Sequence, residues 1–178
     1  ALLGNFDAKF LESLPSEVLI AVMKKHQRYF PVFDAEGKLM PYFIIVRNGD
    51  AAHAELVVEG NLQVILARFV DAEFFIKEDM TKSLAEFLPA LDLLTFQKQL
   101  GSMLDKTHRI EALTRILADK LALDEQDQAT AASAAKLCKA DLASSMVVEM
   151  TSLQGVMGQY YALASGENQA VAEAIFEH

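Results

Sequence analysis

The chain has 178 residues, of which 52% are apolar and 23% are charged, the balance of a folded globular protein rather than a disordered one. Its 25 acidic and 16 basic side chains give a formal net charge of −9, which excludes a uniformly basic surface for nonspecific nucleic-acid binding. A single cysteine, Cys138, excludes an intramolecular disulfide, and we expect a reducing, cytoplasmic location.

Positive charge is concentrated in the first two thirds of the chain. Residues 1–120 hold 14 of the 16 basic residues, so any contact with a polyanion is expected there. No apolar run approaches the roughly 20 residues that span a bilayer, and we expect no membrane partner.

The first predicted elements form a small α+β lobe over residues 1–58. Hydroxyl side chains, a proline and an acid over residues 13–17 are typical of a helix start, and apolar residues then recur at helical spacing until Pro31. Residues 29–33 and 39–46 are rich in aromatic and β-branched side chains and predict two strands of a hairpin.

Residues 59–89 are predicted to form a long connecting helix. Apolar side chains at three- and four-residue spacing give it one stripe, made of Leu62, Ile65, Leu66, Phe69 and Ile76. Glu73 and Lys77 are expected to form an i,i+4 pair on its surface.

The segment 90–178 is expected to be helical throughout. A short apolar helix is predicted over residues 91–96, and a longer one opens near Gly101. Asp124 is expected to cap a further helix that continues to about Val147.

Small residues mark a close helix joint near the end of the chain. Residues 153–161 contain Gly155 and Gly158 and could form this joint or face a partner, and residues 165–167 are expected to cap the last helix. Cys138 is expected to be buried. The predicted fold class is therefore mainly α, with an α+β N-terminal lobe joined by a long helix to a helical domain.

Four long stretches of the sequence resemble a known protein family. They are residues 14–49, which include the run MKKHQRYFPVF, then 58–79, 96–113 and 138–178. In these residues, their order and their spacing, the chain resembles an internal fragment of the beta subunit of the bacterial two-subunit glycyl-tRNA synthetase.

The resemblance implies both a fold and a function. It implies an α2β2 ligase that attaches glycine to tRNA(Gly), with the alpha subunit using ATP and magnesium and the beta subunit binding most of the tRNA. This chain would be part of the beta subunit, with a partial B3/B4-like lobe and an HD-like helical domain. It would carry no catalytic residue, no cofactor and no metal, and would be inactive alone.

An HD-like domain raises a metal-dependent phosphohydrolase as the alternative function. That chemistry needs a His-Asp doublet and further His and Asp ligands around divalent cations. In this chain the doublet position resembles Ala140-Asp141, and His108 is the other candidate. Because alanine has no lone pair to donate, the sequence predicts a degenerate site.

Six basic residues are candidates for tRNA binding. Lys24, Lys25 and Arg28 belong to a run that holds four potentially cationic groups, including His26, in an otherwise acidic protein. The other three are Arg47, Arg68 and Lys77. The alternative is that these residues are solvated or, for Arg68 and Lys77, paired with Asp71 and Glu73.

Two aromatic residues beside this run have alternative roles. Tyr29 and Phe43 could stack on unpaired bases or belong to the core. A third possibility for the whole chain is a purely structural scaffold within the beta subunit.

Overall fold

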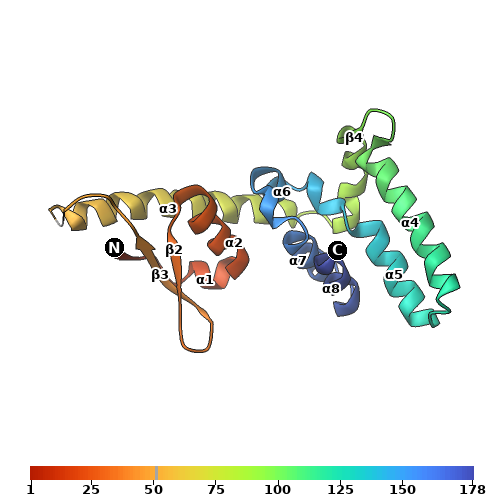
Figure 1. Cartoon of the computed structure of the whole chain (residues 1–178), viewed down its shortest axis with the longest axis horizontal. Coiled ribbons are helices and arrows are strands. Elements are labelled where there is room, and N and C mark those ends of the chain that lie inside the picture. The colour runs from red at the N-terminus through yellow and green to blue at the C-terminus, as the bar shows by residue number, and fades with distance from the viewer. Residues whose placement is uncertain (51) are drawn as a thin grey trace. The chain divides into compact units, whose positions relative to one another are not determined.

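The computed structural model describes residues 1–50 and 52–178. The side chain of His26 is not described. The chain divides into two compact units, residues 1–76 and 77–178 (Figure 1). The predicted class is confirmed, since the fold is mainly helical with a small antiparallel sheet near the N-terminus.

A three-stranded antiparallel sheet lies in the first unit. Its strands β1 (Leu2–Asn5), β2 (Phe30–Phe33) and β3 (Leu39–Ile45) have the order β1-β3-β2. The β2–β3 hairpin confirms the sequence prediction. Strand β1 was not predicted, because its four residues are too few to show alternation and its partner β3 is distant in the sequence.

The helices of the first unit include one irregular turn. They are α1 (Phe10–Ser13), α2 (Ser16–Ala21), a π-helical turn (Val22–His26) and α3 (Ala54–Asp79). The start of α2 agrees with the predicted start. Helix α3 begins at Ala54, before the predicted start at residue 59. It ends before the predicted residue 89, because Ser83 and Glu86 form a capping box that starts a new helical segment.

Aromatic side chains form part of the core of this unit, together with aliphatic residues such as Leu19 and Ile65. The ring of Phe69 on α3 lies 5.1 Å from that of Phe6, edge to face, and the ring of Tyr29 stacks on Phe43 at 5.2 Å. The Phe43 ring also fills the space that a Cβ would need at Gly4, so a larger residue cannot replace this glycine without moving the ring.

The second unit begins within α3 and contains most of the helices. Its first elements are a 3₁₀ helix η2 (Leu84–Leu93), a two-stranded sheet of β4 (Thr95–Gln97) and β5 (Gly101–Ser102), and helices α4 (Met103–Lys120) and α5 (Glu125–Leu137). The remaining elements are 3₁₀ helices η3 (Ala140–Ala143) and η4 (Thr151–Leu153), with α6 (Ser145–Glu149), α7 (Val156–Ala164) and α8 (Gln169–Glu177).

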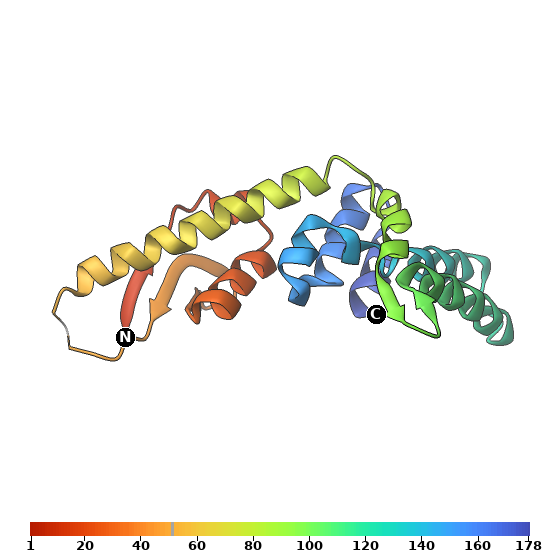
Figure 2. The ribbon, with the colours of Figure 1, turned by 90° about the horizontal axis from the view of Figure 1, so that it is seen from above.

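Helices α4 and α5 both begin with a side-chain cap, and the cap at Asp124 was predicted. The Ser102 hydroxyl accepts a hydrogen bond from the Asp105 amide, and the Asp124 carboxylate accepts one from the Asp127 amide. The two helices run side by side, and α5 also packs on α8 (Figure 2). The last helix is capped by Asn168 rather than by residues 165–167.

Two predicted helices of this unit are wrong. The segment 91–96 contains the end of η2 and the start of β4, so the unit is not helical throughout. The helix predicted from Asp124 to Val147 ends at Leu137, and a 3₁₀ turn separates it from α6. In the described part of the chain, no helix is long and apolar enough to cross a membrane.

Asp79 is a buried acid at the end of α3 and is only 2% exposed. Its Oδ1 accepts a hydrogen bond from the Ser145 amide at 2.8 Å, and its Oδ2 accepts one from the Met146 amide at 2.9 Å. The hydroxyl of Tyr161 on α7 donates to the same Oδ2 at 2.8 Å. One carboxylate therefore satisfies the first amides of α6 and fixes a side chain of α7.

The substitution Asp79→Asn tests this bond set. An amide has one acceptor oxygen and would turn its NH₂ group toward a donor, so we expect a loss of about 2–3 kcal/mol in the free energy of unfolding. Equilibrium urea unfolding measures the loss, with the exposed Asp92→Asn as control. Equal stability of the two variants would contradict the structural role of Asp79.

Candidate nucleic-acid interface

Asp141, the acid at the position that resembles the HD doublet, is completely buried. Its Oδ2 accepts hydrogen bonds from the Gly155 amide at 2.6 Å and the Gly158 amide at 3.1 Å, at the start of α7. A Cβ added at Gly158 would lie 3.1 Å from this oxygen and 2.8 Å from Ile175. The predicted close joint at Gly155 and Gly158 is confirmed, and Asp141 is its acceptor.

Burial dominates the electrostatics of Asp141. It raises the pKa of the carboxyl above the ordinary value, although the amides of Gly155 and Gly158 act in the opposite direction. Among the described residues, its Oδ1 has no hydrogen-bond partner.

The structure gives no support to the phosphohydrolase alternative. Ala140 offers no ligand atom, Asp141 is bonded to backbone amides, and His108 is exposed on α4. Within residues 1–50 and 52–178, no three His, Cys, Asp or Glu side chains form a group that could hold a metal ion. Cys138 is buried, as predicted, and desolvation raises its thiol pKa, so it is poorly suited to be a nucleophile.

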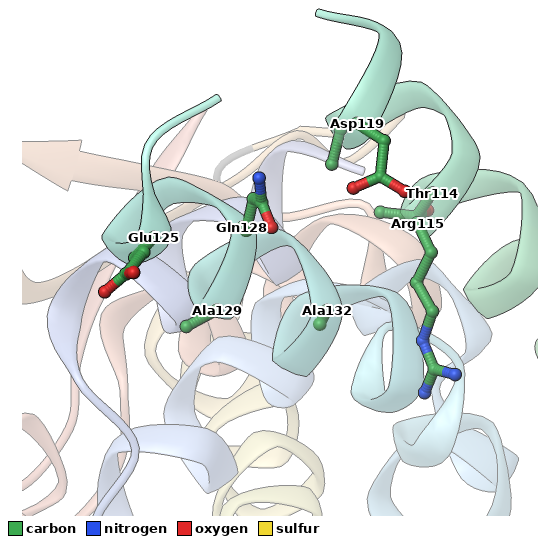
Figure 3. A pocket seen from close by; sticks show the side chains of 8 residues that line it. Thr114, Arg115, Asp119, Glu125, Gln128, Ala129 and Ala132 are labelled. Carbon is green, nitrogen blue, oxygen red and sulfur yellow. The ribbon is translucent and has the colours of Figure 1, made fainter. Parts of the chain in front are cut away.

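A cavity of about 340 Å³ lies between α4 and α5 (Figure 3). Its alanine side chains come from both helices, and Asp119 of α4 and Gln128 of α5 also line it. Its charged lining residues are Asp119, Glu125 and Arg115, and its lining contains no histidine or cysteine. This lining suggests neither a nucleophile nor a phosphate site.

The structure brings three of the six candidate cations together. Lys24 and Lys25 are exposed on the π-helical turn, and Arg28 is exposed just after it. Arg28 has a left-handed backbone with φ of 56°, while the Tyr29 amide bonds back to the Met23 carbonyl at 2.9 Å. This sharp helix end therefore carries three exposed positive residues at positions 24, 25 and 28.

The other three candidates lie elsewhere and have different surroundings. Arg47 is half-buried and donates to the carbonyl of Ala52 at 3.1 Å. Arg68 pairs with Asp71 at 3.9 Å, which confirms the pairing alternative for this residue. Lys77 is nine residues further along α3, a spacing that turns it by about 180° from Arg68.

The predicted aromatic candidates are core residues. Tyr29 and Phe43 are 5% and 0% exposed and stack on each other, and the Tyr29 hydroxyl bonds to Asn61. Phe30, which the sequence reasoning missed, is 56% exposed. Strand alternation was the available signal, since a buried Tyr29 directs the next side chain to the opposite face.

The raised pKa of Asp141 gives a pH-dependent prediction. The native state holds the Asp141 proton more tightly than the unfolded chain, so wild-type stability falls as pH rises from the ordinary aspartate pKa through the raised native one. Asp141→Asn lacks this proton, so its stability relative to wild type should increase over the same range. Urea unfolding at a series of pH values measures the difference, and a pH-independent difference would contradict the prediction.

Comparison with known proteins covers the whole chain. A family model described as glycyl-tRNA synthetase beta subunit matches residues 1–178. The chain is 50% identical over its full length to a glycine–tRNA ligase beta subunit of Synechocystis, and 49% identical to one of Streptococcus gordonii. It spans about a quarter of these relatives, 24% and 26% of their lengths. The chain belongs to the glycyl-tRNA synthetase beta subunit family.

Proposed function

We propose that this chain helps to hold tRNA(Gly) during the ATP-dependent attachment of glycine, as part of the beta subunit of a cytoplasmic α2β2 ligase. The alpha subunit would use ATP and magnesium in this assembly, and the chain alone would be inactive. The similar proteins from Synechocystis and Streptococcus gordonii are glycine–tRNA ligase beta subunits, which supports this reaction class.

The observation that carries the proposal is the exposed cationic run at the end of the π-helical turn. Lys24, Lys25 and Arg28 are exposed in a protein whose net charge is −9, so they form a local site for an anion. Lysine as a point charge and arginine as a planar fork both suit phosphate oxygens. Such contacts would position RNA without reading its sequence.

The exposed ring of Phe30 extends this surface. It lies two residues after Arg28 and opposite Ile44 in the β2–β3 pairing, so a rigid strand positions it. An exposed aromatic ring beside phosphate-binding cations is suited to stack on an unpaired base. The proposed RNA surface therefore consists of Lys24, Lys25, Arg28 and Phe30. Arg47, Arg68 and Lys77 would contribute at most peripheral phosphate contacts.

Reversal of two charges tests the cationic run. In the complete α2β2 enzyme, Lys24→Glu with Arg28→Glu should weaken tRNA(Gly) binding by about tenfold or more, and should reduce the slope of log affinity against log salt by about two. Glycine activation, measured by ATP–pyrophosphate exchange without tRNA, should be unchanged.

Lys38→Glu is the control for one charge reversal elsewhere on the same unit, because Lys38 is also exposed and positive. Unchanged tRNA affinity in the double variant would remove the π-helical turn from the RNA surface and favour the scaffold alternative.

The substitution Phe30→Ala tests the stacking contact. Loss of a base-stacking ring should weaken tRNA binding about fivefold to a hundredfold with little change in stability, since the ring is mostly exposed. Phe43→Ala is the contrast, because this ring is fully buried and its loss should cost about 3–5 kcal/mol of unfolding free energy. Wild-type affinity of Phe30→Ala in a filter-binding assay would exclude the stacking role.

A further inference from the structure

Helix α4 carries an apolar stripe on the side that its neighbour α5 does not cover (Figure 1). Its four large aliphatic side chains recur at helical spacing and are 52–69% exposed: Leu113, Ile116, Leu117 and Leu121. This spacing places them on one face of the helix. Single exposed apolar residues are common on protein surfaces, whereas a row of four indicates a contact surface.

The stripe continues onto the β4–β5 hairpin. Leu100, which lies between the two strands, is 50% exposed, and its carbonyl accepts a hydrogen bond from Nη1 of Arg109 at 2.9 Å. Phe96 on β4 is 38% exposed, and the Nζ of Lys106 lies 4.1 Å from the centre of its ring. These two contacts join the hairpin to the first turns of α4, so the apolar surface includes both elements.

The charged residues that border the stripe are basic. Arg109 lies one turn before Leu113, Lys120 lies one turn after Ile116, and both cations are exposed. Lys98 on the hairpin is exposed as well. Because residues four positions apart are neighbours on a helix surface, Arg109 and Lys120 lie at the two ends of the stripe.

The acidic residues of α4 have other surroundings. Asp105 accepts hydrogen bonds from the amide and the hydroxyl of Ser102. Glu111 lines a cavity beside η2, and Asp119 lines the cavity between α4 and α5. Within α4, all of which the structure describes, the stripe therefore has cationic neighbours and no acidic member.

This combination of apolar and basic groups selects the kind of partner. An apolar stripe at helical spacing fits the apolar face of a second helix, and basic flanks fit acidic flanking residues. RNA is disfavoured, because aliphatic side chains neither stack on bases nor hydrogen-bond to phosphates. A second copy of the same face is also disfavoured, since its cations would meet cations.

The small area of the stripe favours a partner in the same polypeptide. Four partly exposed aliphatic side chains offer on the order of a few hundred Å². A typical stable interface between separate proteins takes about 800 Å² from each partner. A segment of the same polypeptide needs less area, because its effective concentration is high. This chain spans 24% of the Synechocystis relative, so most of such a protein lies outside the matching region and can contain the partner helix.

We propose that the stripe of α4, together with the β4–β5 hairpin, binds an acidic amphipathic helix from another part of the same beta subunit. Leu113, Ile116 and Leu117 would pack on the apolar face of that helix. Arg109 and Lys120 would pair with its carboxylates. The inference rests on the proposed function only in taking this chain as part of a beta subunit.

Cysteine labelling of the complete α2β2 enzyme tests whether the stripe is covered. The thiol of Leu113→Cys should react with a maleimide about tenfold more slowly, or slower still, in the native enzyme than in urea. Val148→Cys is the matched control and should react at nearly its rate in urea, because Val148 is 61% exposed in the same unit and Leu113 is 60% exposed. Mass spectrometry of the labelled peptides gives both rates. A native rate of Leu113→Cys close to its rate in urea would overturn the proposal.

Reversal of the flanking charges tests whether the partner is acidic. In the Leu113→Cys enzyme, Arg109→Glu with Lys120→Glu should raise the labelling rate about tenfold, because the partner helix would be repelled. Lys82→Glu with Lys136→Glu is the matched double variant, since both lysines are exposed in the same unit, and it should leave the rate unchanged. If Arg109→Glu with Lys120→Glu also leaves the rate unchanged, the partner is not acidic and the proposal fails.

Photo-crosslinking identifies the partner segment. A benzophenone amino acid at position 117 of the purified enzyme should join to a beta-subunit peptide outside residues 1–178 that has more acidic than basic side chains. A crosslink to the alpha subunit, to a second copy of residues 1–178, or to added tRNA(Gly) would overturn the proposal. None of these experiments measures tRNA affinity, so their outcome is separate from that of the Lys24 and Arg28 variant.

Discussion

The second unit depends on buried carboxylates that accept hydrogen bonds from backbone amides at the starts of helices. Asp79 accepts from the first amides of α6, and Asp141 accepts from the first amides of α7. Both helices are short, with five and nine residues, so little of their stability can come from their own hydrogen bonds. A carboxylate supplied from elsewhere in the chain satisfies the amides that the helix itself leaves unpaired.

This arrangement explains why the buried acids of this unit are structural. The sequence predicted Asp141 at the position of a catalytic ligand in an HD-like domain, yet its bonds go to Gly155 and Gly158. Exposed cations of the first unit, such as Lys24 and Arg28, carry the proposed ligand contacts instead.

The parts of the fold that were predictable are those set by neighbours in the sequence. The cap at Asp124 and the β2–β3 hairpin depend on residues a few positions apart, and both were identified. The bond from the Ser145 amide to Asp79 spans 66 positions, and β1 pairs with a strand some forty residues away. No local pattern encodes such contacts, so the breaks around η3 and the third strand were missed.

In the candidate site, too, the features set by neighbouring residues were predictable and those set by the fold were not. The cationic run was visible in the sequence, because three of its members are nearly consecutive. The face on which each aromatic ring lies depends on the alternation of side chains along the strand. The buried Tyr29 was therefore proposed as a stacking residue, and the exposed Phe30 was overlooked.

The proposed RNA surface consists of Lys24, Lys25, Arg28 and Phe30, and its two lysines can be probed chemically. Amine labelling of the complete α2β2 enzyme, read by mass spectrometry with and without tRNA(Gly), tests it most directly. We expect tRNA to protect Lys24 and Lys25 from labelling, while exposed Lys38 and Lys98 react equally in both states. Equal labelling of all four lysines with and without tRNA would contradict it.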